Sequence, residues 1–419
     1  MNLEFNSLKN IQDFLSNNRW SDVKRTYSPE DISKLRPPIQ VSYTLSEFGS
    51  KNLWDLLNRD DQWVSSLGVA TAQQAAQLYN LNYEMIYVSG WQVAAESNNG
   101  VNTYPDLSLY PSNSGPDFVQ KINNTLLRIM TEKKVSYLPP VVADAESGFG
   151  GIYNVYNLTQ QFIASGLAGI HFEDQLAAEK KCGHMGGKVV IPTGEYLKKL
   201  AASRLSADVA GVPLVIIART DALTAKLITS DFDERDKPFI SNKRTEDGYY
   251  LIENNQELAI TKSLAYAEIA DVIWCETNNP DLGFAKEFAD EIKSKYPQKI
   301  LAYNCSPSFN WVDKFTDEEI KTFQEKLSSY GYKLQFVSLA GFHSLSSSMY
   351  QLGKEFKGGD MSAIVKLQEL GFKLSEEGYT AIKHQQEVGG NYYETIGEIL
   401  LGENSNLLST KDSTETEQF

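Results

Sequence analysis

Eight short apolar runs, each closing on polar residues and followed by a helix-like stretch, constrain the fold of this 419-residue chain most strongly. The runs cover residues 67–71, 84–90, 137–146, 169–174, 213–221, 271–277, 300–306 and 334–340. Near-continuous apolar runs are typical of strands that are covered on both faces, as in parallel sheets. Eight strand-helix repeats therefore predict an α/β protein with a (β/α)₈ TIM-type barrel. In that fold the catalytic groups sit at the C-terminal ends of the strands.

Helix-start and helix-stop signals lie between these runs. Thr316 and Glu319 form a capping box, and we expect the helix that they open to end at Gly331. A second helix is expected between Pro192 and Gly211. We expect four regions: a helical segment at 1–60, the barrel at 61–350, a helical appendage at 351–404 and a polar tail at 405–419.

Composition limits the function classes. The chain is 42% hydrophobic and 22% charged, which is typical of a globular protein with a sizeable core. A net charge of −15 argues against nucleic acid and anionic membranes as partners, so basic residues that converge should serve a small anion. The three cysteines include no C-x-x-C pair and do not form a disulfide framework. No secretory signal or run of about 20 apolar residues is evident, so we expect a cytoplasmic protein.

The segment KKCGHMGGK, residues 180–188, places Cys182 and His184 among three lysines and three glycines. Positive charge near a thiol favours the thiolate, so we expect a lowered pKa for Cys182. Glycines let the backbone fold closely around a ligand. The segment therefore predicts a mobile loop that brings an ionisable sulfur to an anionic substrate. The alternative is an exposed basic turn.

Four carboxylates follow strand-like runs or lie in adjoining loops: Asp106, Asp144, Glu146 and Glu173. An oxygen-rich cluster of this kind suits Mg²⁺, which keeps several waters and takes few direct protein ligands. We expect one or two of the four to touch the ion. The alternative for each is helix capping or salt bridging.

Donors for substrate carboxylates also lie after the apolar runs. Arg219 ends a strongly apolar run, where a guanidinium needs a carboxylate partner. That partner is either a substrate or a structural ion pair with Glu276 or Asp221. Neutral donors that could bind a second carboxylate are Asn304, Ser306, Ser308 and Ser338. The backbone amides of Ser89 and Gly90, with the face of Trp91, fit a small 2-oxo acid.

The remaining cysteines and histidines are expected to be mainly structural. Cys275 reads as a small core residue, and Cys305 lies among the neutral donors near the site. We expect His171, His343 and His384 to be structural, with His171 close enough to Glu173 to orient groups in the site.

Nine motifs together resemble isocitrate lyases, in the family's order and along essentially the whole chain: SGWQ, TYPD, VVADAESGFGG, HFEDQ, KKCGHMGGKV, ARTDA, IWCET, YNCSPSFNW and LAGFH. KKCGH and NCSPSFNW are the most specific. The chain lacks the long insertion of eukaryotic members, so it is similar to bacterial-type enzymes of the isocitrate lyase/phosphoenolpyruvate mutase superfamily. The resemblance implies a Mg²⁺-dependent barrel, with Mn²⁺ as a substitute, that cleaves isocitrate to glyoxylate and succinate in the glyoxylate cycle. It also implies a homotetramer with helices exchanged between subunits.

The resemblance assigns roles to individual residues. Asp144 would hold the metal, and Asp106, Glu146 and Glu173 would bind its waters or complete its shell. Ser89, Gly90, Trp91 and Arg219 would hold the glyoxylate portion. The succinate portion would be held by Gly183, His184, Asn304, Ser306, Ser308 and Ser338, with Cys305 and Pro307 in the same segment. Cys182 would exchange the proton on the succinate carbon, and Tyr87 or Glu276 would deprotonate the substrate hydroxyl. The tail at 405–419 would close over the site.

One departure and three rival readings stay open. Ser338 stands where the family has Thr, and the missing methyl group makes 2-methylisocitrate a second substrate to consider. A silent barrel that binds a dicarboxylate is a rival from another class. A phosphonate-forming barrel enzyme is the third reading, and the complete KKCGH segment disfavours it.

Overall fold

Eight parallel strands form the central sheet of the computed structural model, which describes residues 7–60, 62–402, 405–410 and 413–417. Their spatial order is β1-β12-β11-β10-β6-β4-β3-β2. The strands are β1 (Val64–Leu67), β2 (Ile86–Val88), β3 (Val141–Asp144), β4 (Gly169–Glu173), β6 (Val215–Thr220), β10 (Val272–Cys275), β11 (Ile300–Asn304) and β12 (Tyr332–Val337). An isolated parallel bridge between Gly68 and Tyr87 joins β1 to β2, which closes the sheet into a barrel.

The predicted barrel is confirmed, with two strands placed too late along the sequence. Six of the predicted runs contain their strand, the run 334–340 misses the first two residues of β12, and the run 67–71 overlaps β1 only at Leu67. Ser65 and Ser66 hid the start of β1 because they interrupt the apolar pattern. The buried Ser66 hydroxyl is satisfied because it donates to the Met85 carbonyl at 2.7 Å.

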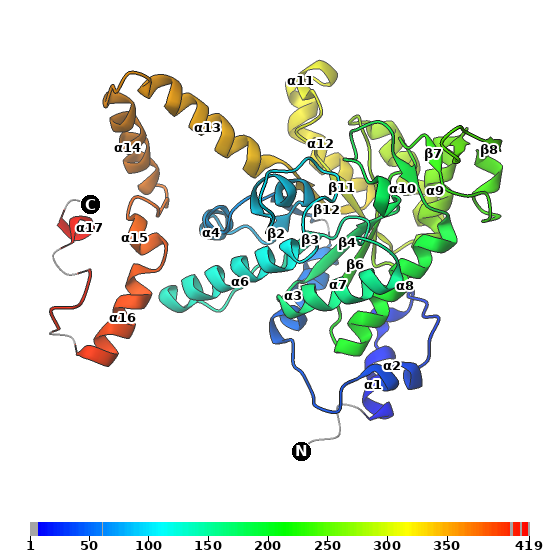
Figure 1. Ribbon diagram of the computed structural model, residues 1–419, viewed down its shortest axis with the longest axis horizontal. Coiled ribbons are helices and arrows are strands. Elements are labelled where there is room, and N and C mark those ends of the chain that lie inside the picture. The colour runs from blue at the N-terminus through cyan, green and yellow to red at the C-terminus, as the bar shows by residue number, and fades with distance from the viewer. Residues whose placement is uncertain (1–6, 61, 403–404, 411–412, 418–419) are drawn as a thin grey trace.

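Helices surround the barrel on its outer side (Figure 1). The helices up to β12 are α1 (Leu8–Leu15), α2 (Pro29–Leu35), α3 (Thr44–Leu57), α4 (Ala72–Asn80), α5 (Gly90–Gln92), α6 (Ser114–Lys133), α7 (Ile152–Ala164), α8 (Thr193–Ala210), α9 (Asn255–Tyr266), α10 (Leu282–Lys295), α11 (Trp311–Lys314) and α12 (Asp317–Tyr330). Both predicted helices have their expected ends. Thr316 and Glu319 form the capping box of α12, and Gly331 and Gly211 end α12 and α8 in the left-handed conformation.

Large side chains fill the barrel interior. Tyr87 stacks on Phe336 with ring centroids 4.0 Å apart, and Trp274 meets Phe336 edge-on at 5.1 Å. Because side chains alternate along a strand, Ile86 and Val88 pack outward against the helices while Tyr87 points inward. This interior layer forms a rigid floor below the C-terminal ends of the strands.

A small four-stranded sheet beside the barrel was not predicted. It consists of β5 (Val189–Val190), β7 (Leu227–Ile228), β9 (Tyr250–Ile252) and β8 (Ile240–Arg244), in that order. Strands of two residues leave too little pattern to be seen in a sequence. Because β5 begins directly after Lys188, this sheet fixes the C-terminal end of the KKCGHMGGK segment.

The C-terminal region is helical and extends away from the barrel as an arm (Figure 1). It contains α13 (Ala340–Phe356), α14 (Ser362–Ser375), α15 (His384–Glu387), α16 (Gly390–Leu401) and α17 (Thr414–Glu417). Helix α13 runs without interruption across residue 350, where we expected the barrel to end. Many apolar side chains of the arm are exposed, such as Tyr350 at 75% and Leu400 at 75%. None of the helices in the described ranges is long and apolar enough to cross a membrane.

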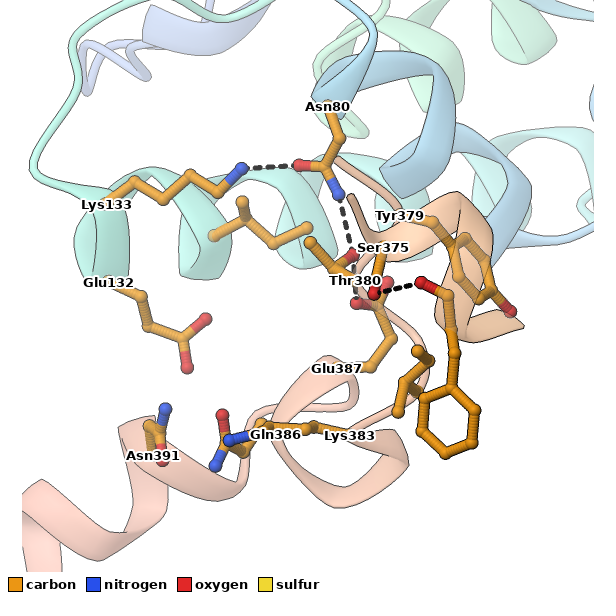
Figure 2. Close-up of a pocket in the computed structure, with 13 residues that line it drawn as sticks. Asn80, Glu132, Lys133, Ser375, Tyr379, Thr380, Lys383, Gln386, Glu387 and Asn391 are labelled. Carbon is orange, nitrogen blue, oxygen red and sulfur yellow. Dashed lines mark hydrogen bonds between the residues drawn. The ribbon is translucent and has the colours of Figure 1, made fainter. Parts of the chain in front are cut away.

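A roomy hollow of about 550 Å³ lies where the arm meets α4 and α6 (Figure 2). Lys133 donates to Asn80 at 2.6 Å, Asn80 donates to Thr380 at 2.9 Å, and Thr380 donates to Glu387 at 2.6 Å. This chain of bonds ties the arm to the barrel. No Cys, His or Arg lines the hollow, so we look for the chemistry elsewhere.

Candidate active site

A second, much smaller cavity lies at the C-terminal ends of the barrel strands, where the sequence predicted the site. Its volume is about 30 Å³, which is room for a water molecule or two. The residues that line it are Tyr87, Ser89, Trp91, Asp106, Asp144, Cys182, Gly183, His184, Arg219, Trp274, Glu276, Asn304, Ser338 and Leu339. Twelve of these fourteen were candidates from the sequence, and Trp274 and Leu339 were missed because they look like ordinary core residues.

The four predicted metal carboxylates do converge, and the ammonium of Lys180 lies among them. Lys180 is buried, contacts Asp106 and Glu146, and lies 4.0 Å from Glu173. Burial alone would lower the pKa of Lys180, but Asp106, Glu146 and Glu173 together raise it well above its ordinary value. We expected the lysines of this segment to attract substrate carboxylates. Lys180 instead serves carboxylates of the protein.

Asp144 is held in position by the backbone. Its Oδ2 accepts from the Gly90 amide at 3.2 Å, and its Oδ1 accepts from the Glu146 amide at 2.8 Å. Burial, then the charge of Glu146, raises the pKa of Asp144 to about 7. A Cβ on Gly90 would lie 2.8 Å from Asp144 Oδ2, so only glycine allows this close approach. Glu146 has a φ of 56°, a strained value for a residue with a side chain.

Arg219 has the structural partner that the sequence left open. It donates to both oxygens of Asp221, at 2.9 and 3.1 Å, and also lies 3.2 Å from Glu173. Asp221, and not Glu276, is therefore the ion-pair partner. Asp221 also accepts from Lys188, whose ammonium donates to Asp221 at 2.9 Å and to the Gly183 carbonyl at 2.7 Å. Arg219 also lines the cavity, so its role in binding a substrate carboxylate stays a prediction.

The expected thiolate of Cys182 is wrong for this structure. Burial, then the charge of Asp106, raises the pKa of the thiol to about 12, and the opposing effects of the His184 amide, Lys180 and Arg219 are smaller. The sequence suggested a lowered pKa because it shows the neighbouring lysines but not where their charges go. Lys180 and Lys188 are both engaged by buried carboxylates.

Tyr87 and His171 form a buried pair on the cavity floor. The Tyr87 hydroxyl lies 3.0 Å from His171 Nε2, and His171 Nδ1 lies 3.5 Å from Asp144 Oδ1. Burial, then Asp144, raises the pKa of Tyr87 well above 10, so its phenol keeps its proton. Burial lowers the pKa of His171 well below its usual range, so its ring is neutral. His171 therefore lies beside Asp144, whereas we expected it to lie near Glu173 and orient groups in the site.

Several buried polar atoms at the cavity have no hydrogen-bond partner. They are His184 Nε2, Glu276 Oε2 and Asn304 Oδ1. Glu173 Oε1, which lies off the cavity and 4.0 Å from the Lys180 ammonium, also has no hydrogen-bond partner. His184 Nδ1 lies 3.9 Å from Glu276 Oε1, and Asn304 donates weakly to the same oxygen at 3.5 Å. Buried polar groups are normally paired, so this concentration of unsatisfied atoms in one place indicates a ligand site.

Comparison with known proteins shows the family of the chain. The model of the isocitrate lyase family matches residues 7–243 and 241–419. The chain belongs to the isocitrate lyase family. The isocitrate lyase of Mycobacterium tuberculosis is 49% identical over 415 residues, which is 97% of this chain and 96% of that protein. Those of Halalkalibacterium halodurans and Escherichia coli are 48% and 46% identical and cover 96% of this chain and 95% and 96% of their own. These relatives are bacterial, as the missing insertion indicated.

Solved structures support the fold. Oxaloacetate acetylhydrolase aligns with a TM-score of 0.62 at 22% identity, covering 86% of this chain and 99% of that one. 2,3-Dimethylmalate lyase, described as a member of the phosphoenolpyruvate mutase/isocitrate lyase superfamily, aligns with a TM-score of 0.58 at 20% identity, covering 86% and 96%. Both solved structures therefore share the barrel fold of this isocitrate lyase family member.

Some of the residues expected in an isocitrate lyase site do not line the cavity. Gly90 lies behind its wall, at Asp144. Beyond Asn304, the four residues Cys305, Ser306, Pro307 and Ser308 also lie off it. Cys305 packs in the core beside Gln324, because neighbouring side chains at a strand end point to opposite sides. The Ser306 hydroxyl is fully buried and accepts from the Ser308 amide at 3.1 Å.

The described part of the tail lies on the arm of its own chain. Glu415 accepts from the Gln385 amide at 2.6 Å and lies 3.2 Å from His384 Nδ1, and Glu394 accepts from Ser409 and Thr410. Residues 411–412 and 418–419 of the expected lid are outside the described residues. In this arrangement the tail stabilises the arm.

Proposed function

We propose that this enzyme cleaves isocitrate to glyoxylate and succinate by a retro-aldol reaction, as the names of its relatives indicate. The observation that carries the proposal is the cavity at the strand ends. It gathers a thiol, an imidazole, a guanidinium and three carboxylates from segments more than 100 residues apart. The composition supports a cytoplasmic location.

A divalent metal fits the carboxylate cluster, which we define as Asp106, Asp144, Glu146 and Glu173. The donors are hard oxygens, Glu173 Oε1 is buried without a hydrogen-bond partner, and Gly90 leaves the room beside Asp144 that a Cβ would fill. We propose Mg²⁺, with Mn²⁺ as a substitute, held by Asp144 and surrounded by the other three carboxylates. When bound, the ion supplies positive charge that stabilises the oxygen of the forming aldehyde.

The residues of this chain divide the substrate between them. Arg219, with Ser89 and Trp91, binds the glyoxylate portion, and a guanidinium suits a carboxylate because it donates two parallel hydrogen bonds. His184, Asn304 and Ser338, with the Gly183 backbone, bind the succinate portion. Gly90, whose amide bonds to Asp144, and the 306–308 turn lie off the cavity and hold its wall in place. The succinate carboxylate becomes a dianion when the bond breaks, and these donors stabilise it because they are already in place.

Cys182 delivers a proton to the succinate carbon. Its raised pKa keeps the thiol protonated at neutral pH, which is the form that the cleavage direction needs. In the reverse direction the same sulfur removes that proton as a thiolate. The structure thus supports the acid role of Cys182 while it contradicts the expected resting thiolate.

Glu276 is the better candidate for the base that deprotonates the substrate hydroxyl. Its Oε2 is buried, unpartnered and on the cavity wall. Tyr87, the other candidate, keeps its proton because burial raises the pKa of its phenol. Tyr87 is therefore assigned to orient His171 and, through it, Asp144.

We further propose a homotetramer in which arms are exchanged between neighbours. The exposed apolar residues of α13, α14 and α16 support this, because apolar side chains gathered on the surface of neighbouring helices mark an interface. In the assembled enzyme the tail at 405–419 acts as a lid that excludes water from the dianion.

The test is glyoxylate release from isocitrate with and without Mg²⁺. Release that stops with EDTA and returns with added Mg²⁺ supports the metal-dependent lyase. A barrel that only binds dicarboxylates would release none under any condition, and that result would reject the proposal.

A second activity, on 2-methylisocitrate, is favoured by Ser338, which lines the cavity at a position where we expect Thr in the family. A change of one methyl group is worth about 1 to 3 kcal/mol in discrimination. We expect Ser338→Thr to lower kcat/KM for 2-methylisocitrate more than kcat/KM for isocitrate. Equal effects on both substrates would remove this candidate.

A further inference from the structure

Three contacts fix the KKCGHMGGK segment over the cavity. Lys180 contacts Asp106 and Glu146, the Gln175 side chain pairs with the backbone of Lys181 at 2.8 and 3.0 Å, and Lys188 donates to the Gly183 carbonyl at 2.7 Å. The tip at residues 185–187 is exposed. The remaining space, about 30 Å³, is far too small for a six-carbon tricarboxylate. The segment must therefore move before substrate can enter.

The Lys180 contact differs from the other two because it places an ammonium group between two carboxylates. The Lys180 ammonium lies among the carboxylates proposed to bind a divalent cation, so the lysine and the metal ion would compete for the same oxygens. Consistent with this, no group of three or more His, Cys, Asp or Glu side chains in the described parts of the chain is arranged to hold a metal ion as it stands.

We propose that Lys180 is an internal countercation that clasps the catalytic segment shut until a divalent metal displaces its ammonium from Asp106 and Glu146. Metal binding would then free Cys182, two residues away, to move with the segment and admit substrate. Lys180 is a positioning residue in this scheme. The inference rests on the metal site of the proposed function, and it adds an order: metal binds before substrate enters.

The proposal predicts a change at Cys182 that needs no turnover. In EDTA-treated full-length protein, alkylation of Cys182 by iodoacetamide, followed by mass spectrometry of its peptide, should accelerate about tenfold when MgCl₂ is added. In Lys180→Met, alkylation should be fast without metal and change little with it. Lys181→Met is the matched control, because Lys181 is partly exposed and its ammonium contacts the side chain and carbonyl of Glu179. It should behave like wild type.

Mg²⁺ affinity is the second readout. A site that is competent in only a fraction of molecules binds with a Kd raised by that fraction. Calorimetric titration should therefore show tighter Mg²⁺ binding to Lys180→Met than to wild type, by about tenfold. Weaker binding to Lys180→Met would overturn the proposal, because it would show that Lys180 organises the carboxylates for the metal.

The outcomes separate this proposal from the proposed function. Mg²⁺ binding to wild type with an unchanged alkylation rate at Cys182 would reject the proposed role of Lys180 and leave the proposed metal site standing. Absence of Mg²⁺ binding to wild type and both variants would reject the two together. The wild-type comparison needs no substitution, so it decides the matter even if Lys180→Met does not fold.

Discussion

Cys182 shows how far a side chain's chemistry depends on groups that are distant in sequence. Two lysines of its own segment are engaged by carboxylates from other loops and strands, and the sulfur is left in a buried setting that keeps it a thiol. A proton donor poised in this way suits carbon protonation, since the ideal acid still holds its proton when the bond breaks.

Cys182→Ser should fold and bind succinate but lose turnover by about two to four orders of magnitude, because an alcohol is a far poorer acid and base than a thiol. The measurement is kcat for glyoxylate release beside a binding titration with succinate. Cys305→Ser is the matched control, since Cys305 lies off the cavity, and it should keep most of its turnover. Near-normal turnover of Cys182→Ser would remove this residue from the mechanism.

The pKa of Cys182 gives a pH profile. With a pKa of about 12, the thiolate fraction of the metal-free protein should rise about tenfold per pH unit across pH 7 to 10, without a plateau. Alkylation rates at Cys182 should follow the same course. A plateau near pH 9, as for an ordinary thiol, would contradict the burial seen here.

At the scale of elements, Lys188 joins the catalytic segment to strand β6 and its following loop. Its ammonium bonds the Gly183 carbonyl on one side and Asp221, the partner of Arg219, on the other. The position of Cys182 and the position of Arg219 are therefore set by one buried lysine. Beside it, β5 carries the chain into the small sheet.

Lys188→Met should destabilise the protein by about 3 to 5 kcal/mol, because removing one partner of a buried ion pair leaves the other charge less compensated. Urea unfolding monitored by circular dichroism would measure this. Lys181→Met should change stability by less than about 0.5 kcal/mol, as expected for a largely surface pair. Equal free energies of unfolding for the two variants would show that the ion pair of Lys188 does not stabilise the fold by this amount.

The elements that the sequence predicts well are those with local patterns. The barrel strands follow from apolar runs, and the ends of α12 follow from Thr316, Glu319 and Gly331. The two-residue strands β5 and β7 have no such pattern and were missed. The candidate site was predicted in its members but not in its pairings, because Lys180 meets Asp106 across 74 residues of chain. Such contacts exist only after the barrel has closed.

At the scale of the whole molecule, the structure of a single chain does not explain why the arm exposes so many apolar side chains. Its helices turn apolar side chains such as Met349, Tyr350 and Ile399 to the surface, where they gain nothing from folding. Burial against other subunits would let these apolar residues contribute to stability. It would also bring the tail of each chain near the active site of a neighbouring subunit.

Light scattering should give a mass about four times that of the chain. Replacing Ile399 and Leu400 together by Glu should lower that mass, because two charges would then be buried at the subunit contact. Val312→Glu, at an equally exposed position on α11, should leave the mass unchanged. A monomeric wild type, or a double variant that stays tetrameric, would refute this role for α16.

The barrel is closed between β1 and β2 by the bridge from Gly68 to Tyr87 and the bond from the Val69 amide to the Tyr87 carbonyl at 3.0 Å, whereas the other neighbouring strands share longer ladders. On its other side Gly68 lies against the end of β12, where a Cβ would lie 2.2 Å from the Ser338 carbonyl oxygen. Short ladders exchange their amide hydrogens through small local openings before the rest of a domain does. We therefore expect the junction between β1 and β2 to be the first part of the barrel to open locally. Since Ser89 and Ser338 stand on either side of it, each opening would briefly spread the two halves of the substrate site apart.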